Sequence, residues 1–152
     1  MKLRVIGLGS PHGDDQVGWE VIRLLQQQTL PTSVELLQLD RPGPALISYL
    51  HDCDHAILID ACDAGWPVGE FRAMDTKQLL ECAELQGGSS HQLGVADSLQ
   101  LAQITGTQLP ELSIYAIQIA QCQPLAAISP QLQQPLMKIT QEIVQSLQKD
   151  AQ

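Results

Sequence analysis

The chain opens with a short apolar run at residues 3–8 that only Arg4 interrupts. Leucine, valine and isoleucine at this density, followed by glycine, are typical of a buried strand in a parallel sheet. Glycines and a proline between residues 7 and 13 then predict a loop. From Val17 to Leu25 the apolar residues recur at helical spacing. A strand, a glycine-rich turn and a helix in this order form the crevice where open α/β sheets bind ligands.

Apolar runs and helical spacing alternate along the rest of the chain. Further strands are predicted at residues 34–39, 56–61 and 112–119, with an edge strand at 68–72. Helices are predicted at residues 45–51, 76–84, 92–104 and 132–147. This alternation predicts an α/β fold: a single three-layer domain over residues 1–152, with a mostly parallel twisted sheet of about five strands and helices on both faces.

Composition narrows the class of protein. The chain has 152 residues, of which 44% are hydrophobic and 3% aromatic, so we expect a globular domain with an aliphatic core. The formal net charge of −9 argues against nucleic acid and anionic membranes as partners. We see neither a secretion signal nor a membrane span in the sequence. The four cysteines form no CxxC pair, so we expect reduced thiols in a cytoplasmic protein.

Three places carry candidate chemistry. Asp14 and Asp15 follow the first strand, Asp60 follows the third strand, and His91 comes after a glycine-serine loop at a helix start. Strand ends of a doubly wound sheet meet at its carboxyl edge, so these side chains can converge there. Two carboxylates and an imidazole suit zinc or nickel with a coordination position left open. Each residue also has a structural interpretation: Asp60 as a turn cap, His91 as a helix start, and Asp14 as an N-cap that leaves Asp15 for other work.

A nucleotide site is the first competing hypothesis. Gly7-x-Gly9 after a strand is the beginning of a dinucleotide pattern, but His12 stands where the third glycine belongs. Phosphates at a helix N-terminus need backbone N–H groups and positive charge. Asp14 and Asp15 would repel them, so the crevice favours a cation.

Cysteine and serine nucleophiles are the second competing hypothesis. Cys62 lies two residues beyond Asp60 and can share its face of the strand, but a buried thiol is the preferred interpretation. No G-x-S-x-G turn is present, which argues against a serine hydrolase. His12 could be a fourth ligand or an acid–base group, but an exposed loop residue is the preferred interpretation. His51 and His55 flank the start of the third strand, at the opposite edge of the sheet, and receive no role.

Three motifs resemble one family. GLGSPHGDDQVG, ILIDACDAG and SSHQLGVADSL, in this order and at these distances, look like the hydrogenase maturation proteases. Those endopeptidases trim the C-terminal tail from the large subunit of nickel-iron hydrogenases. The resemblance runs from residue 5 to about residue 136. It includes Gln123-Pro124 and Ser129-Pro130, which are similar to the family's late E-P and G-L-[ST]-P motifs.

The resemblance implies a site and a substrate. By motif position, Asp15, Asp60 and His91 correspond to the family's metal ligands and catalytic residues, and Asp40 to its acid after strand two. The nickel they bind would be supplied by the substrate, so we expect no tightly bound cofactor. The implied partner is the unprocessed large-subunit precursor. We expect this protein to be a monomer and to act in the cytoplasm. The alternative is a metal-binding or metallochaperone module on the same scaffold, without peptide cleavage.

The chain departs from the family pattern at several positions. Ser10 replaces the usual Asn, and Gln16 replaces a frequent Gly. Some members carry Glu where Asp15 stands, and the shorter Asp would hold a metal closer to the backbone. Residues 39–43 differ from the D-G-G-T pattern of some members, in a loop expected to touch the substrate. All three candidate ligands are retained.

Overall fold

Five strands form one sheet in the order β2-β1-β3-β5-β4. The computed structural model describes residues 1–86 and 90–150, and the side chains of residues 1–82 and 94–150. The strands are β1 (Leu3–Gly9), β2 (Val34–Asp40), β3 (His55–Cys62), β4 (Phe71–Met74) and β5 (Glu111–Gln118). β1 pairs in parallel with β2 and β3, and β3 pairs in parallel with β5. β4 runs antiparallel to β5 at the edge.

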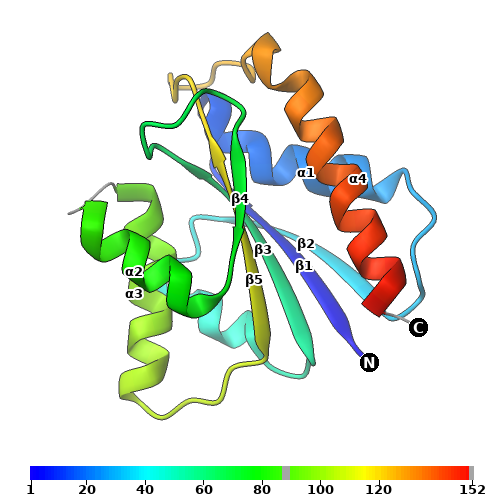
Figure 1. The fold of residues 1–152 in the computed structure, drawn as a ribbon, viewed down its shortest axis with the longest axis vertical. Helices are drawn as coiled ribbons and strands as arrows, with labels where there is room; N and C mark the ends of the chain where they lie inside the picture. The colour runs from blue at the N-terminus through cyan, green and yellow to red at the C-terminus, as the bar shows by residue number, and fades with distance from the viewer. Residues whose placement is uncertain (87–89, 151–152) are drawn as a thin grey trace.

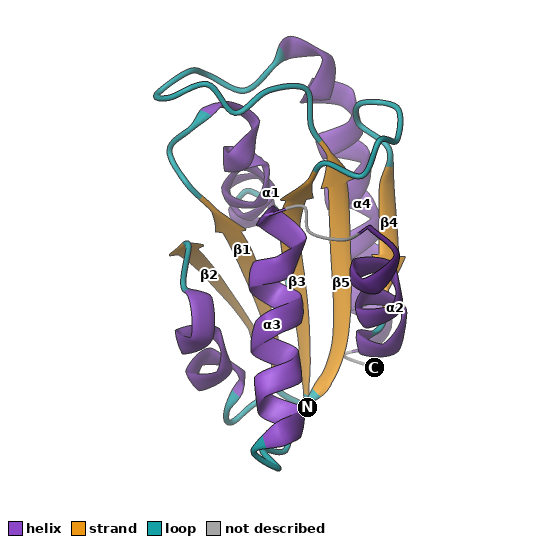
Figure 2. Cartoon of the chain, turned by 90° about the vertical axis from the view of Figure 1, so that its left-hand side faces the viewer, coloured by secondary structure: helices purple, strands orange, loops and turns teal. Residues whose placement is uncertain are grey.

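Helices cover both faces of this sheet. The α-helices are α1 (Val17–Gln26), α2 (Thr76–Gln86), α3 (Ser90–Ile104) and α4 (Gln133–Asp150). Three 3₁₀ helices are η1 (Gly13–Gln16), η2 (Gly43–Leu50) and η3 (Pro130–Leu132). α1 and α4 lie on one face, and α2 and α3 lie on the other (Figures 1 and 2). None of the described helices is both long and apolar enough to cross a membrane.

Successive side chains along each strand point to opposite faces of the sheet, so the hydrophobic core has two halves, one on each face. On β3, Ile57 and Ile59 pack toward α1 and α4, whereas Leu58 packs toward α2, α3 and η2. Successive side chains of a strand point to opposite faces, so Asp60 has the parity of Leu58. The strand pattern therefore directs this carboxylate to the α3 side of the sheet.

Helix α1 lies directly on the strand backbones. A Cβ atom built on Gly18 would be 2.3 Å from the Leu8 carbonyl oxygen and 2.6 Å from that of Ile59. One built on Gly7 would be 2.2 Å from the Gly18 carbonyl oxygen. Glycine at both positions lets α1 approach β1 and β3 to a distance that a side chain would prevent. This contact brings η1, just before α1, against the ends of the two strands.

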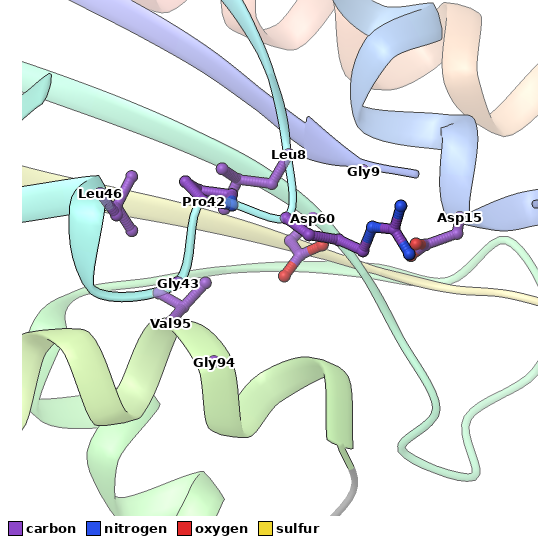
Figure 3. Close-up of a pocket in the computed structure, with 10 residues that line it drawn as sticks. Leu8, Gly9, Asp15, Pro42, Gly43, Leu46, Asp60, Gly94 and Val95 are labelled. Carbon is purple, nitrogen blue, oxygen red and sulfur yellow. The ribbon is translucent and has the colours of Figure 1, made fainter. Parts of the chain in front are cut away.

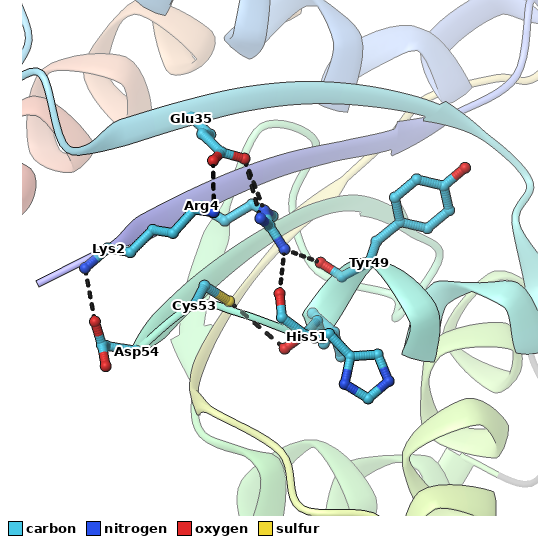
Figure 4. A network of polar contacts seen from close by, with 8 residues as sticks. Lys2, Arg4, Glu35, Tyr49, His51, Cys53 and Asp54 are labelled. Atoms are coloured by element: carbon cyan, nitrogen blue, oxygen red, sulfur yellow. Dashed lines mark hydrogen bonds and ion pairs between the residues drawn. The ribbon is translucent and has the colours of Figure 1, made fainter.

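A half-buried network ties η2 to the sheet (Figure 4). Nη1 of Arg4 donates to the carbonyl oxygens of Tyr49 at 2.8 Å and His51 at 2.6 Å. Its Nε donates to Glu35 Oε2 at 3.1 Å. A guanidinium that is 10% exposed needs such partners to offset its lost hydration. Arg4 of β1 therefore holds the C-terminal end of η2 in place.

The predicted α/β fold and its element order are confirmed, with two local corrections. The helix predicted at residues 45–51 is the 3₁₀ helix η2, in which Ala45 N donates to Pro42 O, three residues back, at 3.2 Å. The edge strand predicted at 68–72 begins later, at Phe71. Glu70 N donates to Pro67 O at 3.0 Å, and this turn occupies the start of the predicted strand.

Substituting Gly18 by Ala should strongly destabilise the protein. Its new methyl would overlap backbone carbonyls, and overpacking of this kind costs about 2–3 kcal/mol of unfolding free energy. Gly94→Ala is the matched control, because Gly94 is also helical and has nothing within 4 Å of a built Cβ. That change should stabilise α3 by about 0.5–1 kcal/mol. Urea unfolding monitored by circular dichroism measures both, and similar midpoints would contradict the close contact.

Candidate functional site

A cavity of about 350 Å³ opens at the carboxyl edge of the sheet (Figure 3). Its lining combines charged and apolar side chains from β1, η1, η2, β3, α3 and the loop after β2. The lining residues are Leu8, Gly9, Asp15, Arg41, Pro42, Gly43, Leu46, Asp60, Gly94 and Val95. The cavity thus lies in the crevice that the β1–α1 pattern predicted.

Asp15 reaches the cavity from η1. Its side chain is nearly buried, with 4% of the residue exposed, and its Oδ2 accepts a short hydrogen bond from the Ser10 hydroxyl. Ser10 N also donates to the Asp15 carbonyl oxygen at 3.4 Å. Ser10, where the family usually has Asn, therefore orients this carboxylate through its hydroxyl group.

Asp60 reaches the same cavity from β3. It is half-buried and is drawn in Figure 3 with Asp15 among the residues that line the cavity. Of the three predicted ligands, the structure brings these two to one cavity. Among the side chains that the structure describes, no cluster of three His, Cys, Asp or Glu suited to a metal ion is present.

The side chain of His91 lies outside the described residues. Its backbone belongs to the first turn of α3, which begins at Ser90. Gly94 and Val95, one turn further along α3, line the cavity with Asp15 and Asp60. The start of α3 is thus placed beside the two carboxylates, and the assignment of His91 stays a prediction.

Asp14 has a structural role that differs from the predicted cap. η1 has no side-chain cap, and the completely buried Asp14 carboxylate instead accepts hydrogen bonds from a distant loop. Its donors are Ala120 N at 2.9 Å, Gln121 N at 3.1 Å, Ser129 N at 2.6 Å and Ser129 Oγ at 2.9 Å. The capping interpretation is wrong because these donors occupy the carboxylate. The inference that one acid of the pair is structural holds.

The late motif is explained by the same contact. Ser129, of the Ser129-Pro130 pair, supplies two of the four hydrogen bonds to Asp14. Gln123 and Pro124 are exposed, so this part of the motif does not reach the cavity. The buried glutamine of this region is Gln118, 4% exposed, whose Oε1 accepts from Ala64 N at 2.8 Å. Sequence reasoning missed Gln118, since its position in a predicted strand gave no sign of polar contacts.

Arg41 is the second residue that sequence reasoning missed. It lines the cavity, and its Nε donates to Asp40 Oδ1 at 2.8 Å. The hydrogen bond and charge of Asp40, and more weakly the charge of Asp15, raise the pKa of Arg41. Asp40, at the end of β2, is half exposed and is not among the lining residues. The loop that departs from the family pattern thus places a positive charge at the acidic site.

Cys62 is a buried thiol, as predicted. Its exposure is 0%, and burial, reinforced by the Asp60 charge, raises its pKa to about 12. A thiol with this pKa is almost entirely protonated at neutral pH, so Cys62 is a poor nucleophile.

The other histidines stay outside the cavity. His12 is half-buried rather than exposed, and its Nδ1 accepts from Leu125 N at 3.3 Å. His55, at the start of β3, contacts Ser113 Oγ at 2.9 Å. The start of β3 lies at the opposite edge from Asp60, so His55 is away from the cavity, as the sequence predicted.

The fold and the cavity define a class of protein: a doubly wound α/β domain with an acidic site at the carboxyl edge of its sheet. The model of the hydrogenase maturation protease family, HycI, matches residues 19–146. The chain therefore belongs to the hydrogenase maturation protease family and is a peptidase of that class. The resemblance inferred from the three motifs is confirmed.

Individual relatives agree with this assignment. The chain is 27% identical over 166 residues to the hydrogenase 2 maturation protease of Escherichia coli (strain K12), covering 99% of this chain and 98% of that protein. The solved hydrogenase maturating endopeptidase HybD from E. coli superimposes with a TM-score of 0.84 at 23% identity, covering 99% and 94% of the two chains. HycI from Thermococcus kodakarensis gives 0.72 at 18% identity, covering 97% and 92%. These structures confirm the fold.

Asp14 and Asp15 should differ sharply when each is replaced by alanine. Asp14→Ala leaves three backbone N–H groups and a hydroxyl without their buried acceptor, which should cost about 3 kcal/mol of unfolding free energy. Asp15→Ala removes the partner of the Ser10 hydroxyl and should cost about 1 kcal/mol. Urea midpoints measure both. Equal losses, or a larger loss for Asp15→Ala, would show that Asp14 does not anchor the loop at residues 120–129.

Proposed function

We propose that this peptidase removes the C-terminal extension of a nickel-iron hydrogenase large-subunit precursor. In this proposal Asp15, Asp60 and His91 bind the nickel that the precursor already carries. The observation that supports it most directly is the convergence of Asp15 and Asp60, from η1 and β3, on one cavity. Membership of the maturation protease family supports the choice of substrate.

Two carboxylates and an imidazole are chemically suited to this task. Carboxylate oxygens and imidazole nitrogen bind ions such as zinc at about 2.0–2.2 Å, and three such ligands leave positions for groups of the substrate. A ligating carboxylate is usually oriented by a hydrogen bond from a neighbouring group. The Ser10 hydroxyl gives Asp15 such a partner.

The position of α3 supports the inclusion of His91. Residues three apart on a helix share a face, and Gly94, three residues after His91, lines the cavity. Asp60 faces the α3 side of the sheet by its parity on β3.

Peptide hydrolysis at this site needs neither a serine nor a cysteine nucleophile. In the proposed reaction a water molecule attacks the scissile carbonyl carbon while a site carboxylate takes its proton. The carbon–nitrogen bond then breaks, and the proton passes to the amine of the released tail. The substrate's nickel can polarise the scissile carbonyl as a Lewis acid. The high pKa of Cys62 supports water over this thiol as the nucleophile.

The cysteines agree with the expected compartment. All four, Cys53, Cys62, Cys82 and Cys122, are free thiols. Reduced thiols are the rule in the cytoplasm, where large-subunit precursors would be met before assembly. We therefore propose a cytoplasmic reaction.

Processing is the first test of this function. Unprocessed large subunits, with and without nickel, are incubated with the protein, and the C-terminal mass is read by mass spectrometry. Wild type should release the tail only from nickel-loaded precursor. His91→Ala should abolish release, because one of three ligands is lost, whereas Cys62→Ala should cleave at a nearly normal rate.

Stability measurements complete the comparison of these two variants. His91→Ala should melt close to wild type if its role is confined to the site. Cys62→Ala removes a buried group and should lower the unfolding free energy by about 1 kcal/mol. If Cys62→Ala loses cleavage and His91→Ala keeps it, the Cys62 thiol is the nucleophile. That result would contradict the metal-recognition mechanism. Nickel transfer without any change of mass would favour the metallochaperone alternative.

Metal content is an independent prediction. Three ligands from three separate elements, with open coordination positions, should bind a free ion only modestly, so the purified protein should lose its nickel or zinc on extensive dialysis. Elemental analysis by mass spectrometry measures this. Stoichiometric metal that survives dialysis would instead indicate a resident catalytic ion.

A further inference from the structure

Arg41 stands in an unusual place for a positive charge. It lines the cavity together with Asp15 and Asp60 and is the cation among the described residues that do so. Its side chain is 63% exposed and can therefore change position at little cost in packing. A divalent ion that approaches the two carboxylates must enter the field of this guanidinium.

The backbone at this position would accept glycine more easily. Arg41 has a φ of 45°, in the left-handed region that L-residues rarely adopt. Its N–H donates to Gly9 O at 3.0 Å, and Trp19 Nε1 donates to Leu39 O at 3.0 Å, so the strands and α1 hold the loop in this conformation. A strained backbone that carries a charged side chain into a site is a reason to look for a function of that side chain.

Two carboxylates compete for the guanidinium. Nε of Arg41 donates to Asp40 Oδ1 at 2.8 Å, and the charge of Asp15 also acts on Arg41. Asp40 holds the guanidinium by this hydrogen bond, and the negative charge of Asp15 in the cavity also attracts it. The positive charge of Arg41 thus partly offsets the negative charge of the acidic site before any metal binds.

We propose that Arg41 is a specificity-determining residue that disfavours free divalent cations at Asp15 and Asp60. A bare ion of charge +2 is repelled by the guanidinium. A divalent ion that arrives enclosed by anionic ligands of a protein carries little or no net positive charge and escapes this repulsion. Arg41 would thereby let the site distinguish a metal-loaded protein from a free ion. This inference rests on the proposed metal recognition and adds a selectivity residue to it.

Binding of free nickel tests the inference without any peptide substrate. Titration calorimetry at low ionic strength compares wild type with Arg41→Gln and Arg41→Gly. One positive charge at about 8 Å from a divalent ion in a water-like medium changes its affinity by roughly fivefold. Both variants should therefore bind nickel roughly fivefold more tightly than wild type, and the difference should shrink in high salt.

Arg23→Gln is the matched control. Arg23 is also an exposed arginine whose Nε binds a neighbouring carboxylate, Glu20 Oε2, at 2.9 Å, and its loss changes the net charge equally. It lies in the last turn of α1, away from the cavity. Its nickel affinity should stay within twofold of wild type. Arg41→Gly should melt at or above the temperature of wild type, because glycine relieves the strained backbone.

The results separate this inference from the function it rests on. If Arg41→Gln and Arg23→Gln bind nickel with equal affinity, the proposed role of Arg41 is overturned. The same holds if neither variant gives a detectable heat of binding. Failure of wild type to process any nickel-loaded precursor would overturn the proposed function, whatever the calorimetry shows. We expect wild type to process the nickel-loaded precursor. We also expect both Arg41 variants, but not Arg23→Gln, to bind nickel more tightly than wild type.

Discussion

The carboxylate of Asp14 holds together parts of the chain that are more than one hundred residues apart. It receives hydrogen bonds from Ala120, Gln121 and Ser129, in the loop between β5 and η3, while its own backbone belongs to η1. A buried charge with four donors is stable, whereas the same charge without them would be very costly. The position of Asp15, the next residue in η1, depends on this anchor.

A second constraint acts from the opposite side. Gly18 lies against the carbonyl oxygens of Leu8 and Ile59, so α1 can take only one depth on the sheet. The hydrogen bonds of Asp14 hold the loop at residues 120–129 against η1. Gly18 sets how closely α1 approaches the sheet. The cavity carboxylate between them is therefore held by rigid neighbours, as a precise ligand or catalytic group requires. Two adjacent acids have separate tasks because one side chain points into the structure and the other into the cavity.

The electrostatics of the cavity depend on local charges and not on the net charge of the protein. The net charge of −9 is a property of the whole surface. What distinguishes the cavity is the arrangement of Asp15, Asp60 and Arg41 over an apolar wall that includes Leu46 and Val95. In the mechanism that we propose, opposite charges on the same wall would make the site selective for how a metal is presented and not only for its charge. An apolar wall next to them suits a polypeptide better than a small hydrophilic ligand.

The sequence by itself determined the layers and the positions of the acids. Apolar runs that alternate with helical spacing can fold only as a sheet covered by helices, and strand ends of a parallel sheet share one edge, so Asp15 and Asp60 could be assigned to one crevice. Tertiary structure alone decided what surrounds them. The donors to Asp14, the turn that delays β4 and the left-handed backbone that brings Arg41 to the cavity all arise from contacts between distant segments. Local propensity carries no information about such contacts. The groups that bind a buried charge come from segments far away in the sequence, and only the tertiary fold brings them together.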